Sequence, residues 1–319
     1  MKALLYQGIG KMELLELPEP SNEIILEVRK VGICGTDLKA YLRGHPLFAP
    51  PTILGHECYG RIKSSSVEVF REGELVVVAP YAECGRCWRC RKGLGELCRD
   101  KTHLNSGCFV EYIGLSREEA SRLLFKTEEE KTALVLAEPL ACVLESLKEE
   151  GIREALIVGG GPMGALFAIY FKLRGIDALI VEKAPWRANY LRQMGFDVSI
   201  SLDDGKERYD AVILCVDNPG LVERLLPSVE DGGTLLLFAG LPKGKEIKLD
   251  PYHVHYREVQ IRGSFGYKIN TFKQALNEVR AYSNEYEKVI THSFPLEEFE
   301  EAFNLLQRRE SLKIVFEVR

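Results

Sequence analysis

Four cysteines lie close together in the segment CGRCWRCRKGLGELC. Two residues separate each neighbouring pair among the first three, and the fourth follows after seven more, at Cys84, Cys87, Cys90 and Cys98. A structural zinc ion prefers a closed tetrahedron of thiolates, and this spacing allows four sulfurs to surround one ion. Disulfides are one alternative. An iron–sulfur cluster is another, but the bacterial motif that begins in the same way closes with a three-residue gap and a proline. The segment therefore predicts a structural zinc site.

A glycine-rich turn follows an apolar run in ALIVGGGPMGALFAIY, and a helical pattern begins at once. The first glycine of such a turn allows a tight bend, the second lets a pyrophosphate approach the backbone, and the third lets helix and strand pack closely. A phosphate would then meet the helix N-terminus, where a proline suits the first helical position. The alternative is a glycine turn that binds nothing. The residues predicted to bind a nucleotide here are Gly159, Gly161, Pro162, Met163 and Gly164.

Glu182 stands eighteen residues beyond Gly164, at the end of the next predicted strand. A carboxylate at this place can accept hydrogen bonds from both ribose hydroxyls and would repel a 2′-phosphate, which favours NAD over NADP. Lys183 and Arg187 weaken this preference, because either can attract a phosphate. The alternative is a solvated glutamate. Residues after the later strands are further candidates for the cofactor crevice, namely Cys215, Val216, Gly240, Ser264 and Phe265.

The secondary structure that must position these residues differs between the two parts of the chain. Residues 1 to about 125 read as short strands broken by Gly and Pro, which predicts a β-rich domain. From about residue 132, helical patterns alternate with strands predicted over 155–159, 178–182, 197–200, 211–216, 234–239 and 258–263. This alternation predicts a doubly wound parallel sheet. The first helix of this part is expected from Pro139 into KEEGIRE, and two helices and a strand close the chain.

A second set of metal-ligating residue types is dispersed over three segments. Cys34 lies in VGICGTDLKAYLRG, His56 and Glu57 lie in ILGHECYGRI, and Glu138 lies in LAEPLACVLESL. Three protein ligands with one open position are typical of a catalytic zinc ion. Taken singly, each residue is ordinary, because a lone cysteine is usually packing and His-Glu is a common dipeptide.

Together these pieces resemble the zinc-containing alcohol dehydrogenases of the medium-chain dehydrogenase/reductase superfamily, from end to end. The matching motifs are GICGTD, GHExxG, the four-cysteine lobe, the Glu-Pro pair at 138–139, the glycine turn and RGSFGY. At the position of Glu138 the chain resembles the polyol (sorbitol-type) and threonine dehydrogenases, because the liver-type alcohol dehydrogenases have a cysteine as the third zinc ligand. The resemblance implies an α/β protein with a GroES-like catalytic domain over 1–138 and 268–319, and an NAD-binding Rossmann domain over 139–267.

The same resemblance implies roles in catalysis. Cys34, His56 and a glutamate would hold the catalytic zinc, with Glu57 and Glu138 both candidates for the third position. Thr36 resembles the family hydroxyl that takes the alcohol proton toward the cofactor ribose; the alternative is a threonine bonded to backbone. Many relatives carry a histidine where this chain has Lys39, so the chain departs from their proton route at this position. Lys39 and His45 are the candidates to complete the route. The loop after GHECYGRI is also shorter than the family pattern.

Composition excludes several classes of partner. The chain has 319 residues, 46% hydrophobic and 28% charged, with a net charge of −5 and interspersed signs. Such a chain is long enough for two domains, and it offers no basic face for nucleic acid and no polybasic run for a membrane. It lacks a signal peptide pattern and a long apolar span. Because thiolate ligands persist in a reducing compartment, we expect a cytoplasmic protein.

The expected function is zinc- and NAD-dependent hydride transfer from a secondary alcohol, such as a polyol, sugar or cyclitol, with two zinc ions per chain. The alternatives are an amino-alcohol dehydrogenase of the threonine type and a catalytically silent nucleotide-binding relative. A zinc-independent quinone or enoyl reductase should lack both cysteine-containing sites. The family commonly forms homodimers or homotetramers, often through the edge of the cofactor-domain sheet, and the apolar TLLLFAGL strand is compatible with such pairing.

Several other side chains are expected to be structural. His253 and His255 alternate like residues of a strand. Cys58, Cys108 and Cys142 are expected to pack as small apolar side chains. Trp88, inside the four-cysteine segment, is expected to serve packing or a subunit contact.

Overall fold

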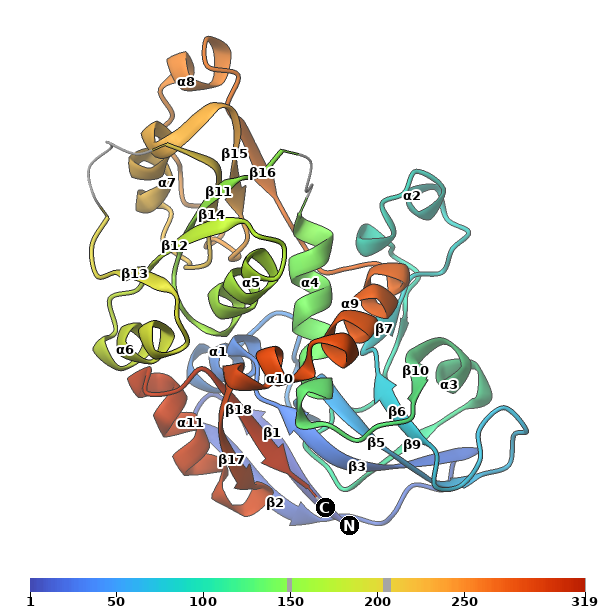
Figure 1. Ribbon diagram of the computed structural model, residues 1–319. Coiled ribbons are helices and arrows are strands. Elements are labelled where there is room, and N and C mark those ends of the chain that lie inside the picture. The colour runs from blue at the N-terminus through green and yellow to red at the C-terminus, as the bar shows by residue number, and fades with distance from the viewer. Residues whose placement is uncertain (148–150, 203–207, 319) are drawn as a thin grey trace. The chain divides into compact units, whose positions relative to one another are not determined.

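The computed structural model describes residues 1–147, 151–202 and 208–318 (Figure 1). The chain forms two compact units. The first contains Met1–Ala141 and Tyr267–Arg319, and the second contains Cys142–Gly266. The two ends of the chain therefore build one unit, and the second unit is an insertion between them. No helix in the described residues has the length and apolar character needed to cross a membrane.

The first unit contains a seven-stranded sheet with the strand path β10-β6-β5-β3-β18-β17, in which β9 also pairs with β3. Its central strand, β3, is antiparallel to β5 on one side and to β18 on the other. Figure 1 shows the C-terminal β17 and β18 in red beside the blue β3. The strands are β3 (Ile24–Gly32), β5 (Glu57–Ser65), β6 (Leu75–Val78), β9 (Tyr112–Leu115), β10 (Leu124–Thr127), β17 (Ile290–Pro295) and β18 (Lys313–Glu317).

Two smaller sheets and several helices complete this unit. One sheet has the order β2-β1-β4, and β7 pairs with β8. The predicted closing helices are present as α9 and α11, and most of the side chains that they bury are apolar at helical spacing, such as Phe272, Leu276 and Val279 in α9. These strands are β1 (Lys2–Gly8), β2 (Lys11–Glu16), β4 (Thr52–Ile53), β7 (Tyr81–Ala82) and β8 (Thr102–His103). The helices are α1 (Gly35–Arg43), α2 (Trp88–Arg91), α3 (Arg117–Leu123), α9 (Ile269–Ala281), α10 (Ser283–Tyr286) and α11 (Phe299–Arg308).

The second unit is a six-stranded parallel sheet in the order β13-β12-β11-β14-β15-β16. This order is that of doubly wound dinucleotide-binding folds, and it agrees with the predicted alternation of strands and helices. The strands are β11 (Glu154–Val158), β12 (Asp177–Val181), β13 (Asp197–Ser199), β14 (Tyr209–Leu214), β15 (Val229–Leu237) and β16 (Gln260–Gly263). The helices are α5 (Pro162–Lys172), α6 (Pro185–Gln193), α7 (Gly220–Leu225) and α8 (Pro251–His255).

Two predictions about the second unit are wrong. His253 and His255 lie in the helix α8, whose N-cap Asp250 accepts a hydrogen bond from the Tyr252 amide. His253 is nevertheless structural, since its Nδ1 lies 2.8 Å from the Arg257 guanidinium. The apolar TLLLFAGL segment does not form the sheet edge, because β15 pairs with strands on both sides. Among the described residues, the edge strands of this sheet are β13 and β16.

Two further expectations changed in detail. The helix expected from Pro139 into KEEGIRE is α4 (Ala137–Ser146). Residues 148–150 of that prediction lie outside the described residues, and residues 151–154 are not helical, because β11 begins at Glu154. Cys58 and Cys108 are buried in the apolar core as expected, but they form a disulfide rather than two free thiols. Cys142 is in no disulfide and is half-buried.

Candidate metal centres and nucleotide-binding turn

The four predicted lobe cysteines converge on one point. Their sulfurs all lie within 4.8 Å of one another. The Sγ–Sγ distances include 3.9 Å from Cys84 to Cys90, 3.4 Å from Cys87 to Cys90 and 3.8 Å from Cys87 to Cys98. Since a zinc–sulfur bond is about 2.3 Å long, a tetrahedron of four sulfurs has edges of about 3.8 Å. The lobe therefore fits one zinc ion.

Backbone amides of the lobe point at the sulfurs. The Cys87 amide donates to Cys84 Sγ at 3.4 Å, and the Asp100 amide donates to Cys98 Sγ at 3.3 Å. Such bonds favour thiolates, and the amides of Arg86 and Cys87 lower the pKa of Cys84 to about 6. Burial and the neighbouring thiols raise the pKa of Cys90 to about 12. The lobe thus needs a cation before all four sulfurs can be ionised together.

The lobe is attached to the first unit through its entry segment. Glu83, next to Cys84, accepts a hydrogen bond from the amide of Ile269 at 3.0 Å, where α9 begins. Tyr81 accepts one from the amide of Tyr267 at 2.8 Å, and the two rings stack with centroids 4.6 Å apart. Trp88 is 56% exposed, so it does not serve as core packing within this chain.

The dispersed set also comes together. Cys34 Sγ, a ring nitrogen of His56 and a carboxylate oxygen of Glu57 lie within 4.8 Å of one another, although Cys34 lies on a different segment from the other two. Cys34 is the N-cap of α1, and Glu57 begins β5. A thiolate, an imidazole and a carboxylate form a donor set that suits a zinc ion with one open position. In the described part of the chain, this trio and the lobe are the two such groups.

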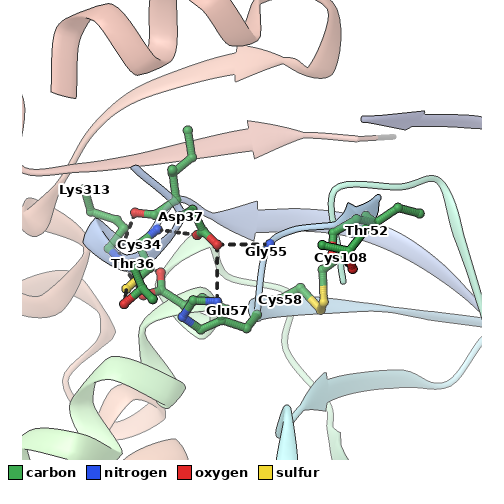
Figure 2. Close-up of polar contacts among 12 residues, drawn as sticks. Cys34, Thr36, Asp37, Thr52, Gly55, Glu57, Cys58, Cys108 and Lys313 are labelled. Atoms are coloured by element: carbon green, nitrogen blue, oxygen red, sulfur yellow. Dashed lines mark hydrogen bonds and ion pairs between the residues drawn. A yellow bond between two sulfur atoms is a disulfide. The ribbon is translucent and has the colours of Figure 1, made fainter. Parts of the chain in front are cut away.

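Asp37 ties the two ligand-bearing segments together, and its side chain is fully buried. Its Oδ2 accepts from the Cys34 amide at 2.9 Å and its Oδ1 from the Gly55 amide at 3.2 Å (Figure 2). Oδ1 also lies 3.5 Å from His56 Nδ1, an arrangement that leaves Nε2 for a metal. Burial lowers the pKa of His56, but Asp37 and the Cys34 sulfur raise it more, so the pKa lies well above its usual range.

Glu57 has a buried partner, Lys313, on the other side of the strand β3. Lys313 Nζ lies 2.8 Å from Glu57 Oε1 and 2.6 Å from Oε2, and it donates to the Ile33 carbonyl at 3.1 Å. Figure 2 shows Lys313 and Glu57 with Cys34 close by. Burial lowers the pKa of Lys313, but the Glu57 carboxylate raises it more. The lysine is therefore held as a cation inside the protein.

Glu138, in the first turn of α4, lies outside the group whose donor atoms are within 4.8 Å of one another in the described residues. It is buried, and the charges of His56 and Glu57 shift its pKa. Burial raises its pKa, His56 lowers it, and Glu57 raises it, with a net value of about 7. Of the two carboxylates considered for the third ligand, Glu57 is thus the one grouped with Cys34 and His56.

The candidates for proton transfer lie on the same unit. Thr36 Oγ1 is 3.5 Å from Cys34 Sγ, at the start of α1. His45 Nδ1 accepts from the Leu47 amide at 3.3 Å, so in the neutral ring Nε2 carries the proton. Burial lowers the pKa of His45, and the charge of Lys39 lowers it further. Lys39 is therefore near enough to His45 for its charge to act on the ring.

The glycine turn has the form that a pyrophosphate requires. Gly159 has a φ of 106°, and a Cβ there would meet Val216. A Cβ on Gly164 would overlap the carbonyl of Gly159, so α5 packs against the turn at a distance that only glycine allows. Gly161 is the N-cap of α5, with Pro162 at its first position and Met163 half-buried behind it. These features fit the predicted nucleotide site.

Glu182 closes this turn from the end of β12. It is buried, and it accepts hydrogen bonds from the amides of Gly160 at 2.9 Å and Ala184 at 2.7 Å. Lys183 is exposed, whereas the Arg187 guanidinium lies 3.5 Å from the place that a Cβ on Gly161 would occupy. The remaining predicted residues lie after parallel strands: Cys215 and Val216 after β14, Gly240 after β15, and Ser264 and Phe265 after β16.

Comparison with known proteins decides the family. The alcohol dehydrogenase GroES-like domain matches residues 20–124, and the zinc-binding dehydrogenase family matches residues 162–281. A D-altritol 5-dehydrogenase from Agrobacterium fabrum is 30% identical over 318 residues, which are 93% of this chain and 94% of the relative. The chain belongs to the zinc-binding alcohol dehydrogenase family.

Three further proteins are similar to this dehydrogenase. It is 29% identical to a sorbitol dehydrogenase of Bacillus subtilis over 344 residues, which cover 99% of this chain and 96% of that one. The structure of 2R,3R-butanediol dehydrogenase from Bacillus subtilis matches with a TM-score of 0.86 at 26% identity, covering 100% and 99% of the two chains. An L-threonine 3-dehydrogenase of Legionella pneumophila is also similar, at 26% identity over 339 residues, 99% of this chain and 98% of that one. The predicted family and fold class are confirmed.

Sequence reasoning missed two residues of this dehydrogenase. Asp37 belongs to the GICGTD motif, and its place three residues after Cys34 in the first turn of a helix was an available signal. Lys313 had no local signal, because its contact with Glu57 depends on strands from opposite ends of the chain.

Replacing Cys90 by serine should remove one lobe thiolate. We expect the loss of one zinc ion per chain and a lower Tm, because a structural zinc site contributes directly to folding. Metal analysis and thermal unfolding measure both effects. Cys142→Ser is the matched control, since Cys142 is outside both groups. A Cys90→Ser protein with the full zinc content and Tm would contradict the assignment.

Replacing Asp37 by asparagine should weaken the dispersed site while the lobe is unaffected. The asparagine keeps the shape of the side chain but loses its charge, so it orients His56 less firmly. We expect metal affinity at this site, or turnover, to fall about 10- to 100-fold. Asp197→Asn, at an exposed position, is the control. The measurement is equilibrium zinc competition with a chelator; equal affinities in Asp37→Asn and Asp197→Asn would rule out the orienting role.

Proposed function

We propose that this dehydrogenase oxidises a secondary alcohol of the polyol, sugar or cyclitol type, with NAD as the hydride acceptor and two zinc ions per chain. The observation that carries the proposal is the convergence of Cys34, His56 and Glu57 on one point, with Asp37 behind the histidine. The relatives named as altritol and sorbitol dehydrogenases support the substrate class.

In this proposal the lobe cysteines hold the structural ion, and Cys34 and His56 hold the catalytic ion together with Glu57 or Glu138. When bound, the catalytic ion supplies the positive charge that lowers the pKa of the substrate hydroxyl. Asp37 keeps His56 in the tautomer and orientation that a metal needs. Because Asp37 also holds the Cys34 and Gly55 amides, the two ligand-bearing segments keep their geometry before the ion arrives.

The proton of the substrate hydroxyl leaves through side chains of the first unit. Thr36 Oγ1 accepts that proton and donates its own toward the cofactor ribose, as its neighbourhood to Cys34 supports. His45 is the next candidate acceptor, because its lowered pKa keeps the ring neutral near pH 7. Lys39, close enough to lower that pKa, is the other candidate for this step.

NAD is the proposed cofactor because of Glu182. The glycine turn receives the pyrophosphate, and the Glu182 carboxylate, held by two backbone amides, accepts the ribose hydroxyls. A 2′-phosphate at that point would meet a buried negative charge. Arg187 lies on the pyrophosphate side, beside Gly161, so it does not by itself favour NADP.

A homodimer or homotetramer is the proposed assembly. Among the described residues, β16 ends the sheet of the second unit. The segment before it exposes large apolar side chains: Leu249, Tyr252, Val254 and Tyr256 are 44%, 54%, 45% and 74% exposed. An apolar cluster beside an open strand edge is a typical contact between subunits.

A second candidate function is the oxidation of an amino alcohol, because L-threonine 3-dehydrogenases are among the relatives. A panel of polyols, cyclitols, aldonates and amino alcohols, followed at the nicotinamide absorbance with NAD and with NADP, separates the two. Turnover of neutral polyols supports the first function, and turnover confined to amino alcohols supports the second. A protein with both zinc ions that turns over none of them contradicts both.

Cys34→Ser should abolish turnover while NADH binding, measured by fluorescence titration, stays within about twofold of the wild type. The reason is that Cys34 supplies the metal thiolate in the first unit, whereas the glycine turn belongs to the second. Cys215→Ser is not a suitable control, since Cys215 lies at the cofactor crevice; Cys142→Ser serves instead. An active Cys34→Ser enzyme with a single zinc ion would rule out the assignment of the catalytic site.

Glu182→Gln should reduce the preference for NAD. Glutamine retains an oxygen for the Gly160 amide but lacks the charge that repels a 2′-phosphate. We expect the ratio of kcat/KM for NAD to that for NADP to fall about tenfold, which corresponds to about 1.4 kcal/mol. Lys183→Gln, at the exposed neighbour, is the matched control and should change the ratio less. An unchanged ratio in Glu182→Gln would remove Glu182 from cofactor selection.

A further inference from the structure

Lys313 is a buried cation to which the proposed reaction assigns no role. Its side chain is 1% exposed, and its three N–H donors are all used, by the Ile33 carbonyl and by both oxygens of Glu57. Glu57 is itself fully buried. Removing two opposite charges from water is costly, and such a pair is often no more stabilising than apolar side chains of the same size. Stability alone is therefore a weak reason for its presence.

The pair is built across three strands. Glu57 lies on β5 and Lys313 on β18, and β3 runs between them. The residue of β3 that faces Glu57 in the ladder is Gly32, which also faces Val315 of β18. A Cβ on Gly32 would overlap the Glu57 carboxylate. The missing side chain on the middle strand is thus what lets a carboxylate from one neighbour reach an ammonium from the other.

Glu57 lies between two positive centres. On one side is the Lys313 ammonium, and on the other are Cys34 Sγ and a His56 nitrogen, both within 4.8 Å of a Glu57 oxygen, where the proposed metal would lie. An ammonium and a metal ion compete for the same carboxylate lone pairs. If the ammonium were removed, the metal would be the remaining cation near this buried carboxylate.

We infer that Lys313 is a positioning residue that holds Glu57 beside the catalytic metal and limits its binding to the ion. The inference rests on the proposed function, because it assumes a metal at Cys34 and His56, and it deepens that function by assigning control of the ligand set to a residue on the last strand. With Lys313 present, the Glu57 carboxylate stays bound to the ammonium on β18. Without it, Glu57 becomes a firm metal ligand, which leaves less charge on the ion for a substrate hydroxyl.

The test uses the full-length zinc protein and four variants: Lys313→Met, Lys313→Arg, Glu57→Gln and the double variant Lys313→Met/Glu57→Gln. Zinc release to a colorimetric chelator is followed in time, and the phase from the four-cysteine lobe is an internal control that no variant should alter. We expect Lys313→Met to slow release from the other site about tenfold. Lys313→Arg should restore the wild-type rate, and the double variant should release zinc at the rate of Glu57→Gln.

The visible spectrum of the cobalt-substituted proteins is a second measurement that does not depend on activity. An added carboxylate ligand in Lys313→Met should weaken the absorption bands of the catalytic-site cobalt, and this change should disappear in the double variant. A Lys313→Met protein with the wild-type release rate and spectrum overturns the inference. So does an effect of Lys313→Met that persists when Glu57 is already glutamine, because Lys313 would then not act through Glu57.

Lys313→Met leaves an unpaired buried carboxylate and can fail to fold. In that case the comparison of Glu57→Gln with the double variant decides, since neither has that charge. Equal release rates and spectra support the inference, and unequal ones overturn it. A wild-type protein that binds zinc only in the lobe is a different result, which contradicts the proposed function as well. If the wild-type protein binds two zinc ions and the Lys313 substitution changes neither the release rate nor the spectrum, the inference is contradicted but the proposed function is not.

Discussion

The first unit has to keep several carboxylates out of water within a small space. Asp37 and Glu57 are fully buried, and Glu138 is 9% exposed. Buried negative charges that face one another are unstable unless each finds a donor or a cation. Asp37 has two backbone amides and His56, and Glu57 has Lys313. Burial raises the pKa of Glu138 to about 7, with His56 lowering it and Glu57 raising it. A divalent ion at this place would complete the charge balance.

The sheet of the first unit is what brings these charges together. β3 carries the chain toward Cys34, β5 begins at Glu57, and β18 begins at Lys313. Because β3 is the middle strand of the three, residues at the ends of neighbouring strands meet around it. The last strand of the chain is thus part of the site. A C-terminal segment that reads as an ordinary apolar strand, LKIVFEV, supplies the buried cation through its first charged residue.

What could be predicted from sequence was local in sequence. The four lobe cysteines and the glycine turn each lie within one short segment, so their spacing was enough to predict that these residues lie close together. Cys34 and His56 lie on separate segments, and only the resemblance to a family joined them. Lys313 could not be predicted, because its place beside Glu57 requires the register of β3 with both β5 and β18. Contacts of this range depend on the whole sheet and have no short motif.

The two wrong predictions in the second unit have physical causes that were present in the sequence. Alternation over three residues at His253 and His255 is too short to distinguish strand from helix, whereas Asp250 followed by Pro251 is a helix start signal. The TLLLFAGL strand is apolar because parallel strands inside a doubly wound sheet are covered on both faces. Its composition therefore indicated an interior strand, and an edge strand would be expected to carry more polar residues.

The two candidate metal sites differ in what holds them together. The lobe gathers four sulfurs from a short segment, and burial with the neighbouring thiols raises the pKa of Cys90 to about 12. The dispersed site already has its cation in Lys313 and its orienting carboxylate in Asp37, both held by the sheet and by backbone amides. Its donors are therefore brought together by the fold rather than by the ion. An ion held in this way can keep an open position without collapse of the site, which is the condition for binding a substrate hydroxyl.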